Sequence, residues 1–484
     1  MKTNYLTLAA LLAIVTAGCA VGPDYQRPVA SAPAQWAEPL AGGETNAPAS
    51  LAAWWKNFND SELDSLINRA VRSNLDLQVA EARVREARAQ YGIASANLLP
   101  TLDGSASYAR TETSKHQPVL GSIPLPSNIP FDNNVYQAGF DASWELDVFG
   151  GQRRARESAR AQVEASEFGQ RDVLVTLLGD VARDYIDVRG YQRRLAITED
   201  NIQAQNQALA ITQDRFKKGL SNDLDVQQAA SLLATTKAEV PTLQTEIQAS
   251  ILRLGVLLGQ QPENLVAELS TAAPIPTTPP QVPVGLPSQL LERRPDVQRA
   301  ERELASATAN IGVAKADLFP KFFLTGAAGF ESVSASDWFS AGSRFWSTGP
   351  TVQWRIFDAG QIRNNIRIQD ARQQEVLADY EKTMLGAFAD VESGLTAYAN
   401  EQTRRESLQD AVTASRNSLD LANKLYANGL TDFLHVLDAE RSLYQAQDAL
   451  AQSDRTVSVN LVALYKSLGG GWDASGQNAG LAKN

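Results

Sequence analysis

The sequence predicts a mainly α-helical chain that also carries four transmembrane β-strands and is completed only as an oligomer. Three observations predict this class. The chain contains the same succession of elements twice, each half holds a very long stretch of helical character without Pro, and each half holds two stretches in which apolar and polar residues alternate.

Composition excludes several classes of protein. The 484 residues include 44 Lys and Arg against 55 Asp and Glu, a formal net charge of -11, which argues against a nucleic-acid-binding surface. With one Cys and two His (His116 and His435), the chain cannot build a structural zinc site or a Cys–His catalytic pair with any redundancy. The longest apolar run, Leu6 to Gly18, is shorter than the roughly 20 residues of a membrane-spanning helix.

The first residues resemble a secretory signal that ends at a lipid attachment site. Lys2 precedes an apolar run from Leu6 to Val15, and small residues stand directly before Cys19, as in a bacterial lipobox. This predicts a signal peptide over residues 1–18 and a diacylated Cys19 as the mature N-terminus, held in lipid by its acyl chains. Ala20 stands where Asp would retain a lipoprotein in the inner membrane, so we expect outer-membrane sorting. The alternative is an ordinary signal peptide that leaves a free thiol.

The rest of the chain is a duplication. Four pairs of segments carry the alignment: Ala96–Pro100 with Ala316–Pro320, Trp144–Gln152 with Trp354–Gln361, Phe216–Ser221 with Tyr426–Thr431, and Leu257–Gly259 with Ser467–Gly469. The repeat is too long for a solenoid unit of about 20 to 50 residues. We therefore divide the mature chain into an N-terminal equatorial segment (19–60), a first repeat (61–259), a linker (260–286), a second repeat (287–469) and a tail (470–484). Seven of the 21 Pro residues mark the linker region, from Pro262 to Pro287.

Each repeat is expected to contain three helices. A helix of moderate length, 61–98 or 287–318, ends at a Pro; a very long helix, 151–217 or 361–427, follows the strands; a tight Gly turn then leads to a returning helix, 223–258 or 431–468. At 1.5 Å per residue the long helix would reach roughly 100 Å, which is unlike the interior of a compact globule. Its apolar side chains recur about every 3.5 residues from Tyr380 to Tyr426, the spacing of a coiled coil.

Four segments alternate with a period of two: Leu102–Arg110, Val135–Phe149, Lys321–Glu331 and Trp346–Ile356. Alternation with aromatic ends is typical of a transmembrane β-strand, apolar outward and polar inward. The alternative is a soluble sheet with one buried face. In lipid every backbone group must be paired, and four strands cannot close around a lumen, so strands of several copies must complete one barrel. Three copies would supply twelve strands.

Four motifs carry a family resemblance: Cys19–Tyr25 through Pro28, Leu291–Val297 with Ala300 and Glu301, Gly429 with Val436–Ala439, and Leu468–Trp472. With them the chain resembles the outer-membrane factors of tripartite efflux and type I secretion systems, the TolC-like channels. It is most similar to their lipoprotein subclass (NodT-type), which is paired with RND multidrug pumps. The resemblance covers nearly the whole mature chain.

The resemblance implies a homotrimer with a twelve-stranded barrel in the outer membrane, a long α-helical barrel across the periplasm and a mixed equatorial domain. It implies a passive exit duct and no enzyme, served by a periplasmic adaptor protein and an inner-membrane RND-type pump. Apart from the covalent lipid on Cys19 and the surrounding outer-membrane lipid, no cofactor is expected. Neither a nucleophile elbow, a Walker loop nor an HExxH motif occurs in the sequence.

The resemblance also places the two Gly turns at the periplasmic tips. Gly219 and Gly429 suit the left-handed position that ends a helix, and Ser221 or Thr431 can cap the returning helix. The tips would form the aperture of the closed channel, which opens when the adaptor and the pump engage it.

Four residues are expected to form the aperture. By resemblance, Tyr426 would meet Asp225 of the neighbouring hairpin, and Asp438 of three copies would form a self-repelling acidic ring. Some family members carry a second Asp where this chain has His435, which could make the aperture pH-sensitive. The alternatives are that Asp225 is a plain helix cap and that His435 is an exposed neutral residue.

Three tryptophans, Trp144, Trp346 and Trp354, are expected at the membrane interface of the barrel. The loops 111–134 and 332–344 are candidate constrictions, or surface loops with no channel purpose. Two other functions remain open: a type I protein-secretion channel, and a structural lipoprotein that spans the periplasm without conducting.

Overall fold

The computed structural model describes residues 20–28, 33–37, 44–45, 51–112, 114, 132–279 and 282–472. Cys19, the signal peptide, most of the loop 111–134 and most of the tail lie outside these residues. The chain divides into two compact units. The strand unit comprises 1–28, 85–164 and 301–379, and the hairpin unit comprises 29–84, 165–300 and 380–484.

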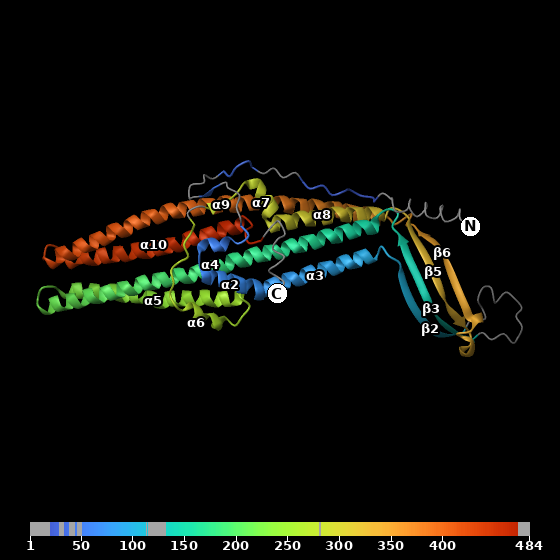
Figure 1. Ribbon diagram of the computed structural model, residues 1–484, viewed down its shortest axis with the longest axis horizontal. Coiled ribbons are helices and arrows are strands. Elements are labelled where there is room, and N and C mark those ends of the chain that lie inside the picture. The colour runs from blue at the N-terminus through green and yellow to red at the C-terminus, as the bar shows by residue number, and fades with distance from the viewer. Residues whose placement is uncertain are drawn as a thin grey trace. The chain divides into compact units, whose positions relative to one another are not determined.

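The long helices have matching lengths in the two halves of the chain. The helices α4 (Gly151–Lys217) and α9 (Gln361–Ala427) each run for 67 residues, and α5 (Asp223–Leu257) and α10 (Phe433–Ser467) each run for 35. Figure 1 shows α4 with α5 and α9 with α10 as two hairpins. No helix in the described ranges combines the length and the apolar character that a bilayer crossing requires.

The shorter helices differ from the expectation, because each predicted helix is broken in two. The first is α2 (Ser61–Ser73) and α3 (Leu75–Ala96), and the second is α7 (Pro287–Arg293) and α8 (Pro295–Ala316). At the first break Asn74 is extended, and its side chain caps α3 by accepting the Leu77 N–H at 2.9 Å. At the second break the ring of Pro295 forces the preceding Arg294 into an extended conformation.

The hairpin unit has one main hydrophobic core. Trp54 and Phe58, in a 3-10 helix (Trp54–Phe58), pack with α2, and the linker adds a second 3-10 helix (Pro262–Leu265) and α6 (Val266–Leu269). The strands β1 (Glu44–Thr45) and β4 (Val282–Pro283) form a short parallel pair. The N-terminal segment from residue 29 onward and the linker therefore share this unit with α5, α10 and most of α4 and α9.

The coiled-coil seam of α9 is confirmed by burial. Its members Tyr380, Val391, Leu395 and Tyr398 are each at most 2% exposed and belong to the main core. Nearer the hairpin turn the seam passes into a second apolar cluster. This tip cluster contains Ala229, Ala422, Phe433, Val436, Leu437 and Ala439.

The strand unit holds one four-stranded antiparallel sheet. Its strands are β2 (Thr101–Glu112), β3 (Asp132–Leu146), β5 (Lys321–Ser332) and β6 (Arg344–Gln353), in the order β2-β3-β5-β6. The two predicted hairpins are therefore joined edge to edge through β3 and β5. Within the described part of the chain, β2 and β6 each have a free edge.

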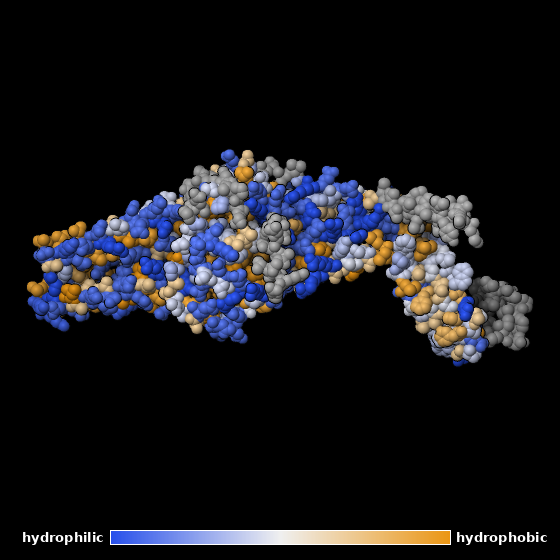
Figure 2. Space-filling view, viewed as in Figure 1, coloured by the Kyte–Doolittle hydropathy of each residue, from blue (hydrophilic) through white to orange (hydrophobic). Residues whose placement is uncertain are grey.

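The register sorts the side chains onto two faces. Directly paired residues of an antiparallel sheet share a face. One face, which we name the apolar face, carries the even-numbered residues, among them Tyr108, Tyr136, Phe140, Phe330 and Trp346. The opposite, polar face carries Asp103, Gln137, Asp141, Glu145 and Glu331, with Val135, Phe323 and Phe345 among its apolar exceptions. Figure 2 shows the hydrophobic residues that gather over the sheet.

Two strands are shorter than the alternation predicts. β3 ends at Leu146 rather than Phe149, and β6 ends at Gln353 rather than Ile356. Trp354 therefore lies just after a strand and not within it. After β3 the chain turns at Val148 and Phe149, and after β6 it bends at Ile356, so the alternation in the sequence continues past the last ladder pair.

Candidate functional sites

The turns of the two hairpins have the same backbone geometry. Gly219 has φ +70° and Gly429 has φ +71°, so both are left-handed. The N–H of the next residue reaches back to a helix carbonyl in each turn, from Leu220 to Arg215 at 2.8 Å and from Leu430 to Leu425 at 2.9 Å. A Cβ atom at either Gly would meet no other atom within 4 Å, so only the backbone conformation demands glycine.

The caps of the returning helices lie one residue later than expected. Asn222 and Asp432 are the N-cap residues, in place of Ser221 and Thr431. The Asn222 side-chain oxygen accepts the Asp225 N–H at 2.9 Å, whereas the Asp432 side chain makes no capping bond. The chain needs two residues after the glycine before it regains the extended conformation of an N-cap, which displaces the cap.

Within one chain Arg215 and Tyr426 make a contact between the hairpins at the tip, beside the tip cluster. The Arg215 guanidinium lies 4.4 Å from the centre of the Tyr426 ring, and the Phe433 ring lies 5.2 Å away. The Tyr426 hydroxyl oxygen is buried without a hydrogen-bond partner among the described residues. Asp225 instead accepts a hydrogen bond from the Ser221 hydroxyl at 2.6 Å. Sequence reasoning did not single out Arg215.

His435 and Asp438 are both exposed on the first turns of α10. They line a shallow groove of about 500 Å³ between α9 and α10, together with small residues such as Ser415 and Ala422. Asp438 pairs with Arg441 at 3.0 Å, but both side chains are more than half exposed, so this ion pair contributes little stability. The groove leaves His435 and Asp438 open to solvent in a single chain.

Glu440 is a buried acid that sequence reasoning missed. It is 9% exposed, and its Oε2 atom has no hydrogen-bond partner among the described residues. Burial raises the pKa of Glu440 to about 7. The sequence did hold a signal, because Val436, Leu437, Glu440 and Leu443 follow the spacing of one helix face, which puts the carboxyl on an apolar stripe.

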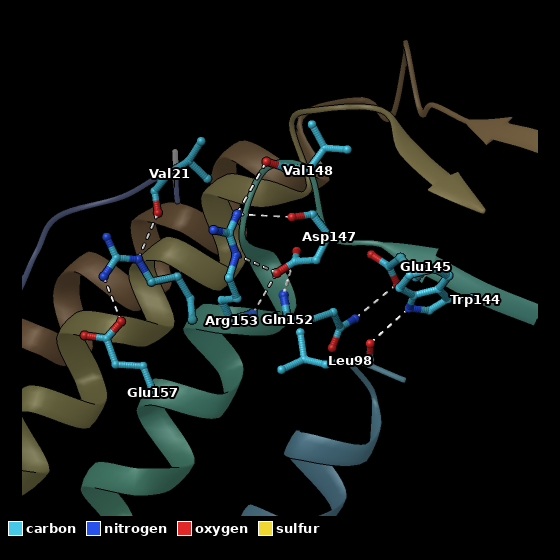
Figure 3. Close-up of polar contacts among 10 residues, drawn as sticks. Val21, Leu98, Trp144, Glu145, Asp147, Val148, Gln152, Arg153 and Glu157 are labelled. Atoms are coloured by element: carbon cyan, nitrogen blue, oxygen red, sulfur yellow. Dashed lines mark hydrogen bonds and ion pairs between the residues drawn. The ribbon is translucent and has the colours of Figure 1, made fainter. Parts of the chain in front are cut away.

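Trp144 and Trp354 play equivalent parts in the two repeats. The Trp144 indole N–H donates to the Leu98 carbonyl at 2.9 Å, and the Trp354 indole N–H donates to the Leu318 carbonyl at 3.1 Å. Each indole thus ties the end of the sheet nearest the helices to the residues that follow α3 or α8 (Figure 3 shows the first). Trp346 lies toward the other end of the sheet, opposite Ala328 on the apolar face, and is 78% exposed.

At the N-terminus of each long helix, next to the sheet, a carboxylate accepts backbone N–H groups. The Asp147 side chain accepts the N–H groups of Gln152 at 3.1 Å and Arg153 at 2.9 Å (Figure 3). In the second repeat the Asp358 side chain accepts the N–H groups of Gly360 at 2.9 Å and Ile362 at 2.7 Å. Both carboxylates stabilise a helix N-terminus, whose free N–H groups favour negative charge.

The residues that follow Cys19 are held against the rest of the strand unit by hydrogen bonds and an ion pair. The Val21 N–H donates to the Phe149 carbonyl at 3.0 Å, close to the end of β3, and Asp24 pairs with Arg154 at 2.6 Å. Tyr25 donates its hydroxyl hydrogen to the carboxylate of Glu301, which is 1% exposed. We name residues 20–28 the N-terminal strap.

Comparison with known proteins identifies the family. Residues 66–260 and 286–470 match the family described as outer membrane efflux protein. The chain belongs to the outer membrane efflux protein family.

Relatives and solved structures are similar to this protein over almost the whole length of the chain. The toluene efflux pump outer membrane protein TtgI of Pseudomonas putida is 34% identical, over 98% of this chain and 100% of its own length. The cation efflux system protein CusC of Escherichia coli K12 is 31% identical, over 95% and 98%. The solved structure of the outer-membrane channel OprN matches with a TM-score of 0.88 and 36% identity, covering 94% of this chain and 100% of that one.

Membership settles the general function and the location. This outer membrane efflux protein is a channel component of an efflux system, and it lies in the outer membrane and extends into the periplasm. Its relatives are parts of efflux and export systems rather than enzymes. Among the described residues, no three His, Cys, Asp or Glu side chains come together as a metal site would require.

At the loop end of its sheet, the efflux protein carries an aromatic cluster that sequence reasoning missed. Trp338 and Phe339, in the β5–β6 loop, pack against Tyr136 and Phe330. Both partners lie on the apolar face. The loop 332–344 therefore packs against the apolar face within this chain.

Proposed function

We propose that the chain works as a homotrimeric exit duct whose sheets close into one twelve-stranded barrel. The observation that carries this is the four-stranded sheet with one apolar face, one polar face and free edges at β2 and β6. Hydrogen-bonding groups on a free edge cannot remain unpaired in lipid. Pairing β2 of one copy with β6 of the next satisfies both edges, and three copies give an even-numbered barrel wider than eight strands.

The regions read from the sequence are part of this proposal. Residues 1–18 are removed as a signal peptide, and the repeats 61–259 and 287–469 supply the barrel strands and a periplasmic α-helical barrel. The segment 19–60, the linker 260–286 and the tail 470–484 contribute to the equatorial domain. The shared core of the first segment, the linker and the long helices supports this assignment.

A lipid on Cys19 fits the geometry of the N-terminal strap. Val21 is bonded beside the end of β3, so a lipidated Cys19 would begin two residues from the base of the barrel. Acyl chains at that level can enter the inner leaflet of the outer membrane without pulling the strap from its contacts. Mass spectrometry that finds an unmodified Cys19 at the mature N-terminus would overturn this part of the proposal.

The partners are a periplasmic adaptor and an inner-membrane RND-type pump, which supply the energy that a passive duct lacks. The curated relatives are named for toluene, cation and pyoverdine transport. This range favours a small molecule or an ion as cargo over a secreted protein. Deleting the gene should sensitise cells to a small toxic cargo, whereas loss of a secreted protein with unchanged sensitivity would favour type I secretion.

The aperture is proposed at the hairpin turns at Gly219 and Gly429. Arg215 and Tyr426 hold the two hairpins of one chain together, and Asp438 of three copies forms an acidic ring next to His435. Asp225, which accepts a hydrogen bond from Ser221 within its own hairpin, meets a neighbouring copy through its other carboxylate oxygen. Repulsion in the ring favours opening, and the contacts between hairpins oppose it.

Single-channel recording in planar bilayers tests the duct and the aperture together. The wild-type trimer should conduct weakly, and changing Asp225 and Tyr426 to Ala should raise its conductance. The control is Asp214→Ala, which removes an exposed carboxylate of the same tip region, where it pairs with Lys218. Equal conductance of the double variant and the wild type would remove the aperture, and complete absence of channels would favour a non-conducting structural protein.

A further inference from the structure

We propose that the loop end of the apolar face is a binding surface for the phosphorylated glycolipid of the outer leaflet. Arg344 contacts a lipid phosphate, and the aromatic cluster of the β5–β6 loop lies beside the acyl chains. The inference rests on the proposed function, in which the apolar face meets lipid and the loop end of the sheet points to the exterior.

The aromatic cluster is continuous across three strands and the loop. The Tyr108 and Tyr136 rings lie 4.9 Å apart, and Tyr136 lies 5.5 Å from Trp338. Trp338 stacks on Phe339 at 4.8 Å, and Phe339 meets Phe330 at 5.5 Å. Aromatic side chains favour the boundary between hydrocarbon and headgroups, so this cluster marks that level at the outer rim.

Short polar bonds fix the shape of the loop. The Ser343 hydroxyl donates to the Asp337 carbonyl at 2.7 Å, and the hydroxyls of Ser334 and Ser336 lie 2.9 Å apart. These bonds close the loop on itself and hold Phe339 outward, where it is 67% exposed. A large apolar ring kept exposed by a closed loop is suited to contact with lipid.

One cation without an ion-pair partner among the described residues, Arg344, lies at the same end of the sheet as the aromatic cluster. Arg344 is paired in register with Phe330, so its side chain leaves from the apolar face, and it is exposed. In the described part of the chain it makes no ion pair, whereas Arg110, at the same end of the sheet, is paired with Asp132 at 2.8 Å. Trp346 lies two residues along the same face, so the order from the loop inward is cation, then aromatic ring, then apolar surface.

The charge of Arg344 and its position on the sheet indicate which molecule binds this surface. Phosphate is the anion that an arginine fork binds well, and a lipid phosphate lies at the headgroup level while its chains lie beside the aromatic rings. The loop end is the end of the sheet opposite the helices, so in an outer-membrane channel that extends into the periplasm it meets the outer leaflet. The phosphorylated glycolipid of that leaflet supplies both groups in one molecule.

The test uses the purified trimer in detergent and measures its melting temperature with added lipid. The probes are bisphosphorylated lipid A, its dephosphorylated form and phosphatidylglycerol. We expect lipid A alone to raise the melting temperature of the wild type. Arg344→Gln should weaken the apparent affinity for lipid A about tenfold, the size of one charge-assisted contact. Arg355→Gln, which removes a cation just after the opposite end of β6, is the matched control and should behave as the wild type.

Several results would overturn the proposal. An unchanged lipid A response in Arg344→Gln, or an equal response to phosphatidylglycerol or to the dephosphorylated form, would do so. A lower melting temperature of Arg344→Gln without lipid would show that Arg344 joins two copies of the chain instead. If that variant does not assemble, Phe339→Ser serves in its place and should weaken lipid A binding. Conductance in bilayers without glycolipid distinguishes a failure of this inference from a failure of the proposed duct. A wild type that conducts but does not respond to lipid A removes the glycolipid surface and leaves the duct standing.

Discussion

Replacing Glu440 by Gln is expected to stabilise the protein at and above neutral pH. Burial raises the pKa of Glu440 to about 7 from an ordinary value of 4.5, and no charged neighbour offsets that effect. Between these two values the folded chain binds more protons than the unfolded chain. The free energy of unfolding therefore falls as the pH rises through this window. The stabilising contribution is complete below pH 4.5 and is lost above about pH 7.

The size of the effect follows from the difference between the two pKa values. At 1.36 kcal/mol per unit, the shift from 4.5 to about 7 corresponds to about 3 kcal/mol per chain. Water that enters the tip cluster when Glu440 ionises would reduce this figure, so it is an upper bound. The Glu440→Gln substitution would keep the volume and the polarity of the side chain while removing the charge.

Thermal unfolding of the trimer, followed by circular dichroism at pH 5 and pH 8, measures the difference. The wild type should lose several degrees more than Glu440→Gln between these conditions, because other titrating groups act equally on both proteins. The control is Glu239→Gln, which changes an exposed carboxylate on α5 and should keep the wild-type pH dependence. Parallel pH profiles for the wild type and Glu440→Gln would refute the reasoning.

Three further variants test other contacts. Arg215→Gln removes the cation–π contact with Tyr426, worth about 1 kcal/mol, and should raise conductance in planar bilayers; no change would show that the contact does not hold the hairpins. Glu301→Gln takes the charge from the buried acceptor of Tyr25, and limited proteolysis should release the N-terminal strap faster than in the wild type. Trp354→Phe keeps an aromatic ring but loses the indole hydrogen bond, and should destabilise the protein by about 1 kcal/mol in a melting experiment.

The long helices and the strands could be predicted because their signals are local and periodic. The bounds of α4 and α9 follow from the run without Pro and the glycine that ends it, and the faces of the sheet follow from alternation. The break at Asn74 could not be predicted, because it depends on one side chain that caps α3 and also donates to the Leu257 carbonyl. The pairing of β3 with β5 could not either, since these strands lie far apart in the sequence.

The residues at the hairpin tips show more clearly what cannot be predicted from the sequence. Resemblance drew attention to Tyr426 and Asp225, yet within one chain the partner of Tyr426 is Arg215. A pairing between side chains on different helices depends on helix rotation and axial offset, which spacing along one helix does not contain. The burial of Glu440 could have been predicted from the sequence. Its position on an otherwise apolar helix face is evident from the spacing of Val436, Leu437 and Leu443.

The free edges of β2 and β6 also bear on how the channel is made. A newly exported copy would present two strands with unpaired backbone groups beside an apolar face, which is the composition of an aggregating surface. Its lifetime in that state depends on meeting two other copies, so the yield of channels should rise steeply with the rate of synthesis. Shielding these edges before assembly would therefore raise the yield of channels, since each channel needs three copies to meet at the membrane.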